Sequence, residues 1–343
     1  MIFRHIRLEA LVPVLPEEIL SSSEIESRLS PLYERLGLPE GRLELMTGIT
    51  ERRLWPKGTL PSEASAMAGK ACLEQESIGP EDIDLLIHAS VSRDCLEPAT
   101  ASMVHHQLGL GQHCQVFDLS NACLGFLNAC SVAGAMIDSG QIRRAMVVMG
   151  ENGRPLIDGT LNELLKEHHT RKTIKDQFAS LTIGCGAVAA LICHEDLAPN
   201  APKLLGGYAA CDSTGSQLCQ GDTSQGETLS MQTDSEQLLK QGVSLAELTW
   251  EGFCNTLHWE ESTPNHFVTH QVGSAHRKLL YETLGLDLGK DHSTFENFGN
   301  IGSVSLPFTL HQAQSERQFQ KGDKIALLGI GSGINCMMMG AEW

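Results

Sequence analysis

The residue types best suited to covalent chemistry in this chain are a cysteine, a histidine and an asparagine that border apolar segments. Cys123 lies at the beginning of the run ACLGFLNACSVAGAMIDSG, which is apolar on nearly every face and predicts an interior helix. The first turn of a helix offers unpaired N–H groups and a positive dipole end, so we expect a lowered pKa and a thiolate at Cys123. Cys130 falls two turns deeper, where nothing stabilises a charge. The sequence therefore predicts a nucleophile at Cys123.

Each of these residues also has a purely structural interpretation. Free cysteines are commonly small core residues, which is the alternative for Cys123. His270 ends an apolar run and equally fits a buried structural histidine. Asn300 follows Gly299 and equally fits a turn, because Asn tolerates left-handed backbone conformations. The order of the surrounding elements favours function over these alternatives.

The elements that would position these residues occur twice along the chain. Three pairs of segments correspond: 84–88 with 266–270, 117–123 with 295–300, and 140–148 with 322–328. The first pair are strand-like runs before helical stretches, the second lead into small-residue helices, and the third are turns entering apolar strands. A common offset of about 180 residues, in one order, indicates duplication of a whole domain rather than a solenoid repeat.

The predicted fold class is α/β, with two duplicated halves and mostly parallel sheets. We place the boundary in the Pro/Asn/Glu-rich stretch 195–202. The N-terminal half, 1–198, then carries the nucleophilic cysteine, and the C-terminal half, 199–343, carries the histidine and the asparagine. Loops at matching positions of related halves would converge, so we expect Cys123 and Asn300 to lie near one centre.

Composition excludes several function classes. The 343 residues carry 42 acidic and 25 basic side chains, a formal net charge of −17, which opposes nucleic acid and anionic membranes as partners. The start lacks a secretory signal and no stretch reaches membrane-spanning length, so we expect a cytoplasmic protein. The 11 cysteines and 14 histidines show no zinc spacing, so no metal site is expected. The polar segment 211–236 is expected to be a long surface or site-covering loop.

Five motifs resemble the ketoacyl synthase III branch of the thiolase superfamily, and the resemblance runs nearly end to end. They are TGITERR at 47–53, SNACLG at 120–125, His270-Gln271, GNIGS at 299–303 and GSG at 331–333. The resemblance implies a thiolase fold, a five-layered αβαβα sandwich, used as a homodimer. Segments 93–100 and 329–338 are most similar to the acyl-CoA condensing enzymes of head-to-head olefin biosynthesis.

The resemblance also implies residue roles. Cys123 would accept the first acyl group from its coenzyme A thioester. His270 and Asn300 would donate hydrogen bonds to the carbonyl of the second thioester and stabilise its enolate. The backbone N–H groups of Cys123 and Ser332 would form the oxyanion hole of the acyl-enzyme, where preorganised donors are most effective.

Glu97 distinguishes two chemistries within this branch. Decarboxylating synthases make their carbanion from a malonyl thioester and tend to carry an apolar residue at the matching position. Here Glu97 would remove an α-proton from a substrate that has no carboxyl group to lose, reaching the site from the neighbouring subunit. A shielded carboxyl group has a raised pKa and suits this role. The alternative is that Glu97, before Pro98, lies on a solvated loop and has no role.

These expectations give one leading function and two alternatives. The leading function is non-decarboxylative Claisen condensation of two fatty acyl-CoA molecules to a 2-alkyl-3-oxo acid, for hydrocarbon biosynthesis. The alternatives are a decarboxylative 3-oxoacyl-acyl carrier protein synthase III and a non-catalytic acyl-binding subunit. No cofactor is expected beyond the coenzyme A of the substrate, and downstream olefin-pathway enzymes are possible partners.

Coenzyme A contacts depart from the pattern of the family. Many relatives place Trp and Arg just before the Thr-Gly-Ile motif to hold adenine, where this chain has Arg42 and Met46. Phosphates need a local basic patch on this acidic protein. The basic candidates are Arg42, Arg52, Arg53, Arg277 and Lys278.

Overall fold

The computed structural model describes residues 1–171, 173–224, 228–317 and 319–343. Its strands form two sets of the same topology, joined by the single pair Arg7 with Lys203. The first set runs in the order β5-β4-β6-β7-β1 and the second in the order β12-β11-β13-β14-β8. In each set the first three strands are mutually parallel and the last two alternate in direction. The predicted α/β fold with duplicated halves is confirmed. The expectation of mostly parallel sheets is wrong, because four strand pairs of this sheet are parallel and five are antiparallel.

The strands of the first set are β1 (Ile6–Val14), β4 (Leu85–His88), β5 (Gln115–Asp118), β6 (Arg144–Asn152) and β7 (Cys185–His194). Those of the second set are β8 (Lys203–Cys211), β11 (His266–Thr269), β12 (Asp291–His292), β13 (Lys324–Gly331) and β14 (Asn335–Glu342). The domain boundary predicted between residues 198 and 199 falls in the connection from β7 to β8, and it stays a prediction.

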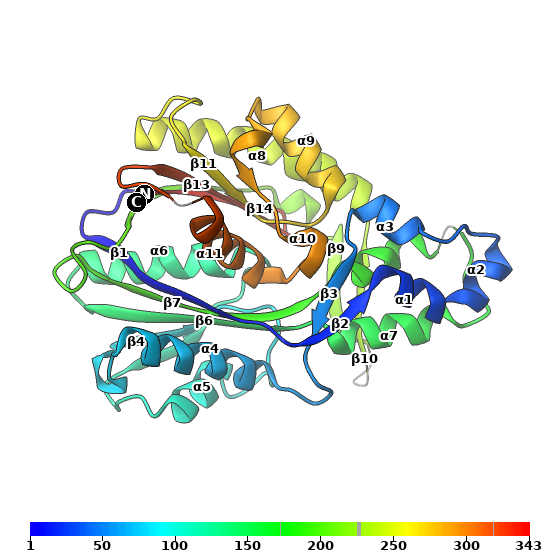
Figure 1. The fold of residues 1–343 in the computed structure, drawn as a ribbon, viewed down its shortest axis with the longest axis horizontal. Coiled ribbons are helices and arrows are strands. Elements are labelled where there is room, and N and C mark those ends of the chain that lie inside the picture. The colour runs from blue at the N-terminus through cyan, green and yellow to red at the C-terminus, as the bar shows by residue number, and fades with distance from the viewer. Residues whose placement is uncertain (172, 225–227, 318) are drawn as a thin grey trace.

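Helices separate and cover the two sheets in five layers (Figure 1). The outer helices are α4 (Pro61–Glu76) and α5 (Thr100–Leu108) on the first sheet, and α8 (Ser235–Leu257) and α9 (Ser274–Leu284) on the second. The central layer holds α6 (Gly125–Asp138) and α11 (Ser305–Arg317). Helix α6 packs against both β6 and β14, and α11 against both β1 and β11. A helix between two sheets must be apolar all round, which explains the composition of α6.

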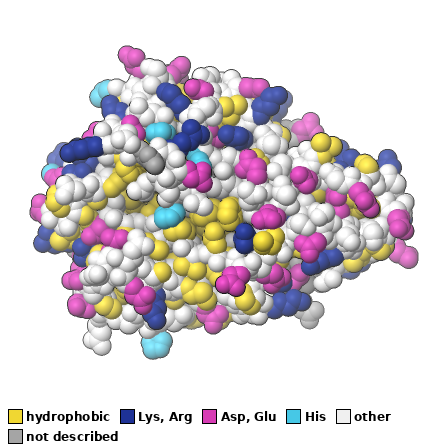
Figure 2. Space-filling view, viewed as in Figure 1, with side chains coloured by type: hydrophobic (Ala, Val, Ile, Leu, Met, Phe, Trp, Pro, Cys, Tyr) yellow, Lys and Arg dark blue, Asp and Glu magenta, His cyan; other side chains and the backbone are white. Residues whose placement is uncertain are grey.

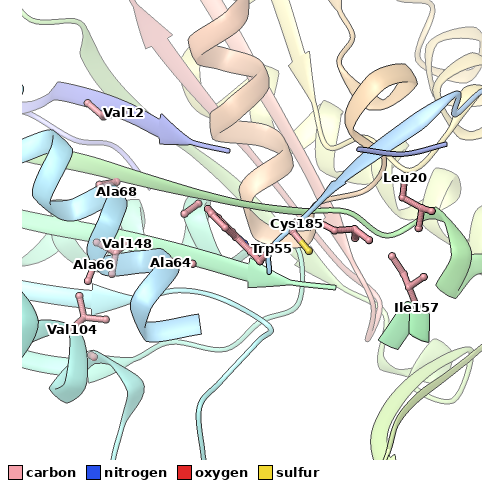
Figure 3. Packing of buried hydrophobic residues seen from close by; sticks show 14 of the residues in the cluster. Val12, Leu20, Trp55, Ala64, Ala66, Ala68, Val104, Val148, Ile157 and Cys185 are labelled. Atoms are coloured by element: carbon pink, nitrogen blue, oxygen red, sulfur yellow. The ribbon is translucent and has the colours of Figure 1, made fainter. Parts of the chain in front are cut away.

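Small residues let the outer helices lie close to the sheet (Figure 3). Ala64, Ala66 and Ala68 of α4 are buried in one cluster with Val148 of β6 and Val104 of α5. Small side chains on the helix and branched side chains on the neighbouring elements allow close packing of this layer.

The remaining elements gather at one end of the molecule (Figure 1). They are two antiparallel strand pairs and five helices. The strand pairs are β2 (Glu18–Ser21) with β3 (Glu51–Leu54) and β9 (Cys219–Ser224) with β10 (Thr228–Thr233). The helices are α1 (Ser22–Arg28), α2 (Ser30–Leu36), α3 (Arg42–Thr47), α7 (Arg154–Leu164) and α10 (Phe295–Phe298). Short 3-10 turns cover η1 (Pro80–Asp82), η2 (Lys175–Thr182), η3 (Ser213–Gly215), η4 (Leu288–Lys290) and η5 (Gly302–Val304).

The prediction of an irregular loop over 211–236 is wrong for its described part. Strands β9 and β10 pair antiparallel from Ser224 with Thr228 to Cys219 with Thr233. Strand β9 has the sequence CQGDTS, which lacks the hydrophobic period that identifies a strand, and the alternation of Leu229 and Met231 in β10 is too short to identify one by itself. Residues 225–227 of that segment lie outside the described residues.

No helix among the described residues combines the length and apolarity needed to cross a bilayer. On the face seen in Figure 2, acidic and basic side chains are interspersed around apolar patches near the middle.

Candidate active site

The strand ends of both halves carry the predicted site residues. In the first sheet His88, Asp118 and Val148 lie in register, so the loops after β4 and β5 leave from one level. In the second sheet Thr269 pairs with Leu328, and the backbone N–H of His270 donates to the Leu328 carbonyl at 2.8 Å. Loops at the carboxyl ends of parallel strands are where α/β folds form their sites.

Cys123 lies in the tight connection between β5 and α6. The preceding Ala122 has a positive φ of 47°, an uncommon conformation for a residue with a side chain. Helix α6 then begins at Gly125, where an added Cβ would lie 1.9 Å from the Ala89 carbonyl oxygen and 3.2 Å from the Ser303 Cβ. Only glycine permits this approach. The turn therefore presses the cysteine loop against the loop that follows Asn300.

The Ser332 loop lies on the other side of the cysteine. A Cβ added to Gly331 would contact the Cys123 nitrogen at 3.4 Å and the Asn121 oxygen at 3.5 Å. Asn335 donates from Nδ2 to the Asn121 side-chain oxygen at 3.2 Å and to the Ser332 carbonyl at 3.2 Å. One amide group thus joins the two loops whose N–H groups are the predicted oxyanion hole.

The expectation of a lowered pKa at Cys123 is wrong for the resting protein. Burial raises the pKa of the Cys123 thiol to about 12, and the nearby Glu151 carboxylate and Cys219 add to the rise. Cys123 also precedes the first helical residue by two positions rather than lying in the first turn. The effect of burial on the thiol pKa outweighs the effect of the nearby helix N-terminus, so Cys123 is a neutral thiol in the resting protein.

His270 is buried, with 2% of its surface exposed. Burial lowers its pKa to about 3, so the imidazole is neutral at neutral pH. Its Nδ1 has no hydrogen-bond partner among the described residues. A neutral imidazole with a free nitrogen can donate or accept one hydrogen bond to a ligand.

The neighbouring Gln271 has a structural task that the His-Gln motif did not reveal. Its Oε1 accepts from the backbone N–H groups of Thr294 at 2.7 Å and Phe295 at 3.0 Å, and its Nε2 donates to the His292 carbonyl at 2.6 Å. Gln271 therefore fixes the His270 loop to the segment that leads to Asn300.

Asn300 is held from both sides by backbone. Its N–H donates to the Thr182 carbonyl at 2.8 Å, and its carbonyl accepts from Gly184 at 2.9 Å. The side-chain oxygen accepts from the Gly302 N–H at 2.9 Å. Since Oδ1 is occupied by this turn, Nδ2 is the group left to donate to a substrate. Both interpretations of Asn300, a turn residue and a functional amide, fit one geometry.

Glu151 was not singled out in the sequence, yet it connects the loops of the site. Its carboxylate accepts from Val91 N at 2.9 Å and Ser92 N at 3.1 Å on one side. On the other side it accepts from Ser303 N at 3.2 Å and Ser303 Oγ at 2.6 Å. The available signal was a carboxylate ending the otherwise apolar run at 145–150.

Glu97 lies on the loop after β4 and is exposed in the single chain, as is Leu96 at 92%. The loop is fixed at its ends, by Asp94 accepting from Ser62 N at 2.9 Å and by Ser92 bonding to Glu151. The tip of this loop is exposed rather than packed on the core of the same chain. Within a single chain, Glu97 is therefore not buried beside Cys123.

The basic residues predicted to contact phosphate lie in different environments. Arg52 is fully buried and donates to the Leu20 and Leu181 carbonyls, at 3.2 and 3.0 Å, so its prediction as a surface phosphate ligand is wrong. Arg53 lies 3.6 Å from Glu51, and Arg277 pairs with the buried Asp291. Arg42 begins α3, is half-buried and has no ion pair among the described side chains.

The exposed Lys278 lies 3.7 Å from Glu282 on the surface of α9. Helix α3, with Arg42, packs against α9 beside the His270 loop: a Cβ on Gly273 would lie 2.9 Å from the Thr47 carbonyl. Arg42 therefore begins the helix whose other end contacts the His270 loop.

A thiol, a neutral imidazole and an amide on converging strand-end loops, in a duplicated α/β sandwich, define a thiolase-fold acyltransferase. Two family models match: 3-oxoacyl-[acyl-carrier-protein] synthase III over 117–201, and its C-terminal part over 254–343. The chain belongs to this synthase III-like family of acyltransferases.

Curated relatives place the chain more narrowly. It is 38% identical to the acyl-CoA:acyl-CoA alkyltransferase of Xanthomonas campestris pv. campestris and 37% to that of Shewanella oneidensis, each covering 100% of both chains. A beta-ketoacyl-[acyl-carrier-protein] synthase III of Aliarcobacter butzleri is 27% identical over 93% of this chain and 92% of its own.

Solved structures agree with this placement. A Cys-to-Ala variant of Xanthomonas campestris OleA superposes with a TM-score of 0.96 at 37% identity, covering 100% of this chain and 98% of its own. A Cys-to-Ser variant of OleA with bound lauric acid and lauroyl-CoA gives 0.95 at 37% identity, covering 99% and 100%.

Proposed function

We propose that this enzyme is an acyl-CoA:acyl-CoA alkyltransferase, which joins two fatty acyl-CoA molecules by a Claisen condensation without decarboxylation. The product after thioester hydrolysis is a 2-alkyl-3-oxo acid. The observation that carries the proposal is the identity of 38% and 37%, over full length, to two acyl-CoA:acyl-CoA alkyltransferases, against 27% to a beta-ketoacyl-[acyl-carrier-protein] synthase III.

The first half-reaction transfers an acyl group to Cys123. The sulfur attacks the thioester carbonyl, the C–S bond to coenzyme A breaks, and the thiol proton leaves with the coenzyme A sulfur. Because burial raises the pKa of Cys123 to about 12, the thiol stays protonated until substrate is bound. The N–H groups of Cys123 and Ser332 stabilise the oxyanion, and the Asn121–Asn335 hydrogen bond holds their loops together.

The second half-reaction forms the carbon–carbon bond. His270 and Asn300 donate hydrogen bonds to the carbonyl of a second acyl-CoA, and a carboxylate removes its α-proton. The enolate attacks the acyl carbon on Cys123, and the cysteine sulfur leaves and regains a proton. A neutral His270, with its pKa near 3, donates to the carbonyl without forming an ion pair with the cysteine.

Glu97 of the partner subunit is the carboxylate we assign as base, in a homodimer. Support comes from its loop, where Leu96, next to Glu97, is 92% exposed and Val91, at the start of the loop, is 53% exposed in the single chain. Large apolar side chains at the tip of an anchored loop are typical of a surface covered by another subunit. Such a cover would also shield Glu97 from water.

Arg42 is our proposed contact for a coenzyme A phosphate, because it alone of the five basic candidates lacks an ion pair or buried hydrogen-bond set in the described chain. Arg53 and Arg277 remain secondary candidates, since each already faces a carboxylate. Coupling to downstream olefin-pathway enzymes is a further part of the proposal.

The test is incubation with two acyl-CoA molecules of different chain length and no malonyl donor, followed by mass spectrometry of the products. The proposal predicts homo- and cross-coupled 2-alkyl-3-oxo products that retain every acyl carbon. Coupling only after malonyl-acyl carrier protein is added would favour the decarboxylative synthase. Absence of coupling under both conditions would favour a non-catalytic acyl-binding subunit.

A further inference from the structure

A cluster of three side chains with metal-ligand chemistry lies far along the chain from the catalytic residues, at the end of α7. Glu163 belongs to the last turn of that helix, and His168 and His169 follow it in the next turn of chain. One oxygen of Glu163 and one nitrogen of each histidine all lie within 4.8 Å of one another. The sequence search missed this group because the two histidines are adjacent rather than spaced by a helical turn.

The separations fit ligands of a tetrahedral ion better than hydrogen bonds. The Nε2 atoms of His168 and His169 lie 3.6 and 3.4 Å from Glu163 Oε1. A hydrogen bond between nitrogen and oxygen is about 2.7–3.2 Å long. Two ligands of one zinc ion, each at about 2.0–2.2 Å, lie about 3.3 Å apart in a tetrahedron.

His169 has the burial and the unpartnered ring nitrogen expected of a metal ligand. Only 6% of it is exposed, and its buried Nε2 has no hydrogen-bond partner among the described residues. Its Nδ1 lies 3.4 Å from the Thr173 hydroxyl, a long contact on the other nitrogen of the ring. Metal-bound histidines are oriented by such a contact on their other nitrogen.

The backbone under the two histidines is fixed by Arg35 of α2. Its guanidinium donates to the carbonyls of Glu167 and His169, each at 2.8 Å, and of Lys166 at 3.1 Å. A ligand set held before binding loses little conformational entropy when the ion arrives.

Glu163 is available as an anionic ligand. Its side chain supplies carboxylate oxygens, which are common ligands of zinc. Lys166 contacts Oε2 at 2.5 Å, whereas both histidines face Oε1. The two oxygens are thus divided between the lysine and the cluster.

We propose that Glu163, His168 and His169 bind one divalent ion of the zinc type, with water as fourth ligand, and fasten the end of α7 to the turn that follows it. A set of two imidazoles and one carboxylate suits zinc among common biological ions. Because α7 packs against β10 and η2, the bound ion would stiffen that corner of the molecule.

Calorimetric titration of chelator-treated enzyme with zinc chloride tests the proposal. We expect one ion bound per chain, a raised Tm, and visible tetrahedral absorption with cobalt(II). H168A and E163Q are expected to weaken binding at least tenfold. The His168 side chain is 63% exposed, so its loss leaves folding intact.

The matched control is H106A, which alters the other consecutive histidine pair of the chain, on α5. It is expected to bind like the parent. Equal affinity in parent, H168A and E163Q would overturn the proposal, as would the absence of any binding in the parent. An octahedral cobalt spectrum would also contradict the assigned geometry.

Discussion

Ser303 donates a hydrogen bond from Oγ to the Glu151 carboxylate at 2.6 Å, across the boundary between the two halves of the chain. The same carboxylate accepts from Val91 and Ser92, at the start of the loop that carries Glu97. One buried side chain therefore positions the loop of the proposed base and the loop of Asn300 against each other. Glu151 acts through these loops, as a positioning residue.

We expect E151Q to lose at least tenfold in kcat with little change in KM for acyl-CoA. Oε1 accepts from Val91 and from Ser303, and Oε2 accepts from Ser92. An amide that keeps its oxygen at the Oε1 position leaves the Ser92 N–H without an acceptor and removes the charge from the other bonds, at about 1.5–3 kcal/mol for each hydrogen bond to a charged group. Steady-state kinetics and thermal melts measure both effects. E195Q, at an exposed ion pair with His5, is the control and should behave as the parent. A purely structural Glu151 would lower Tm and leave kcat per folded enzyme unchanged.

Mixing two inactive variants tests the subunit origin of the base. C123A and E97A are each expected to be inactive, but hybrid dimers pair an intact Cys123 with an intact Glu97 from the partner subunit. After subunit exchange, random pairing would restore about a quarter of the parent activity, because half of the dimers are hybrids with one working site. If Glu97 acted within its own chain, no mixture would regain activity.

We expect substitution of Arg42 to change KM and not Tm, and substitution of Arg52 to change Tm. R42A should raise KM for acyl-CoA about three- to fivefold, the effect of losing about 1 kcal/mol at an exposed charge, with Tm unchanged. R52A should instead lower Tm, because it leaves the Leu20 and Leu181 carbonyls without their buried donor, at about 1–3 kcal/mol each. K70A, on the outer helix α4, is the control for lost surface charge. A KM effect of R52A without a change in Tm would restore its role as a phosphate ligand.

Acid should destabilise the enzyme partly through His270. Its pKa in the folded protein, about 3, lies below the unfolded value of about 6.5, so the unfolded chain binds the proton first as pH falls. Above pH 6.5 the residue has no effect, and from there down to about pH 3 it removes about 1.4 kcal/mol of stability per pH unit.

Urea unfolding of the parent and of H270N at pH 7 and pH 5 measures this contribution. The parent should lose about 2 kcal/mol more than H270N over that interval, since asparagine does not titrate. Equal losses would mean that His270 is accessible to protons in the folded state.

The repeated strand order explains how much of the site was predictable. Segments 84–88 and 266–270 became β4 and β11, equivalent strands of the two sets, and their loops carry Glu97 and His270. Local sequence patterns of this kind predict strands and loops correctly because the hydrophobic period and the turn residues act over short distances along the chain. The fold class and the convergence of the Cys123 and Asn300 loops followed from them.

Three errors at the site share another cause, since each depends on contacts between distant residues. Burial in the folded protein raises the pKa of the Cys123 thiol. The position of a residue near a helix N-terminus does not reveal that burial. Glu151 binds partners 60 and 152 positions away, and nothing at 151 in the sequence identifies them. Arg52 looks like a surface charge in the TGITERR motif, but its donors reach the Leu181 carbonyl 129 positions on.

The central claim is that the first acyl chain is carried on Cys123. Intact-mass measurement after incubation with a single acyl-CoA, with peptide mapping of the adduct, tests it most directly. The account predicts one acyl group per chain, mapped to Cys123, present in C130A and absent in C123A. An adduct on another residue, or the same adduct in C123A, would contradict the account.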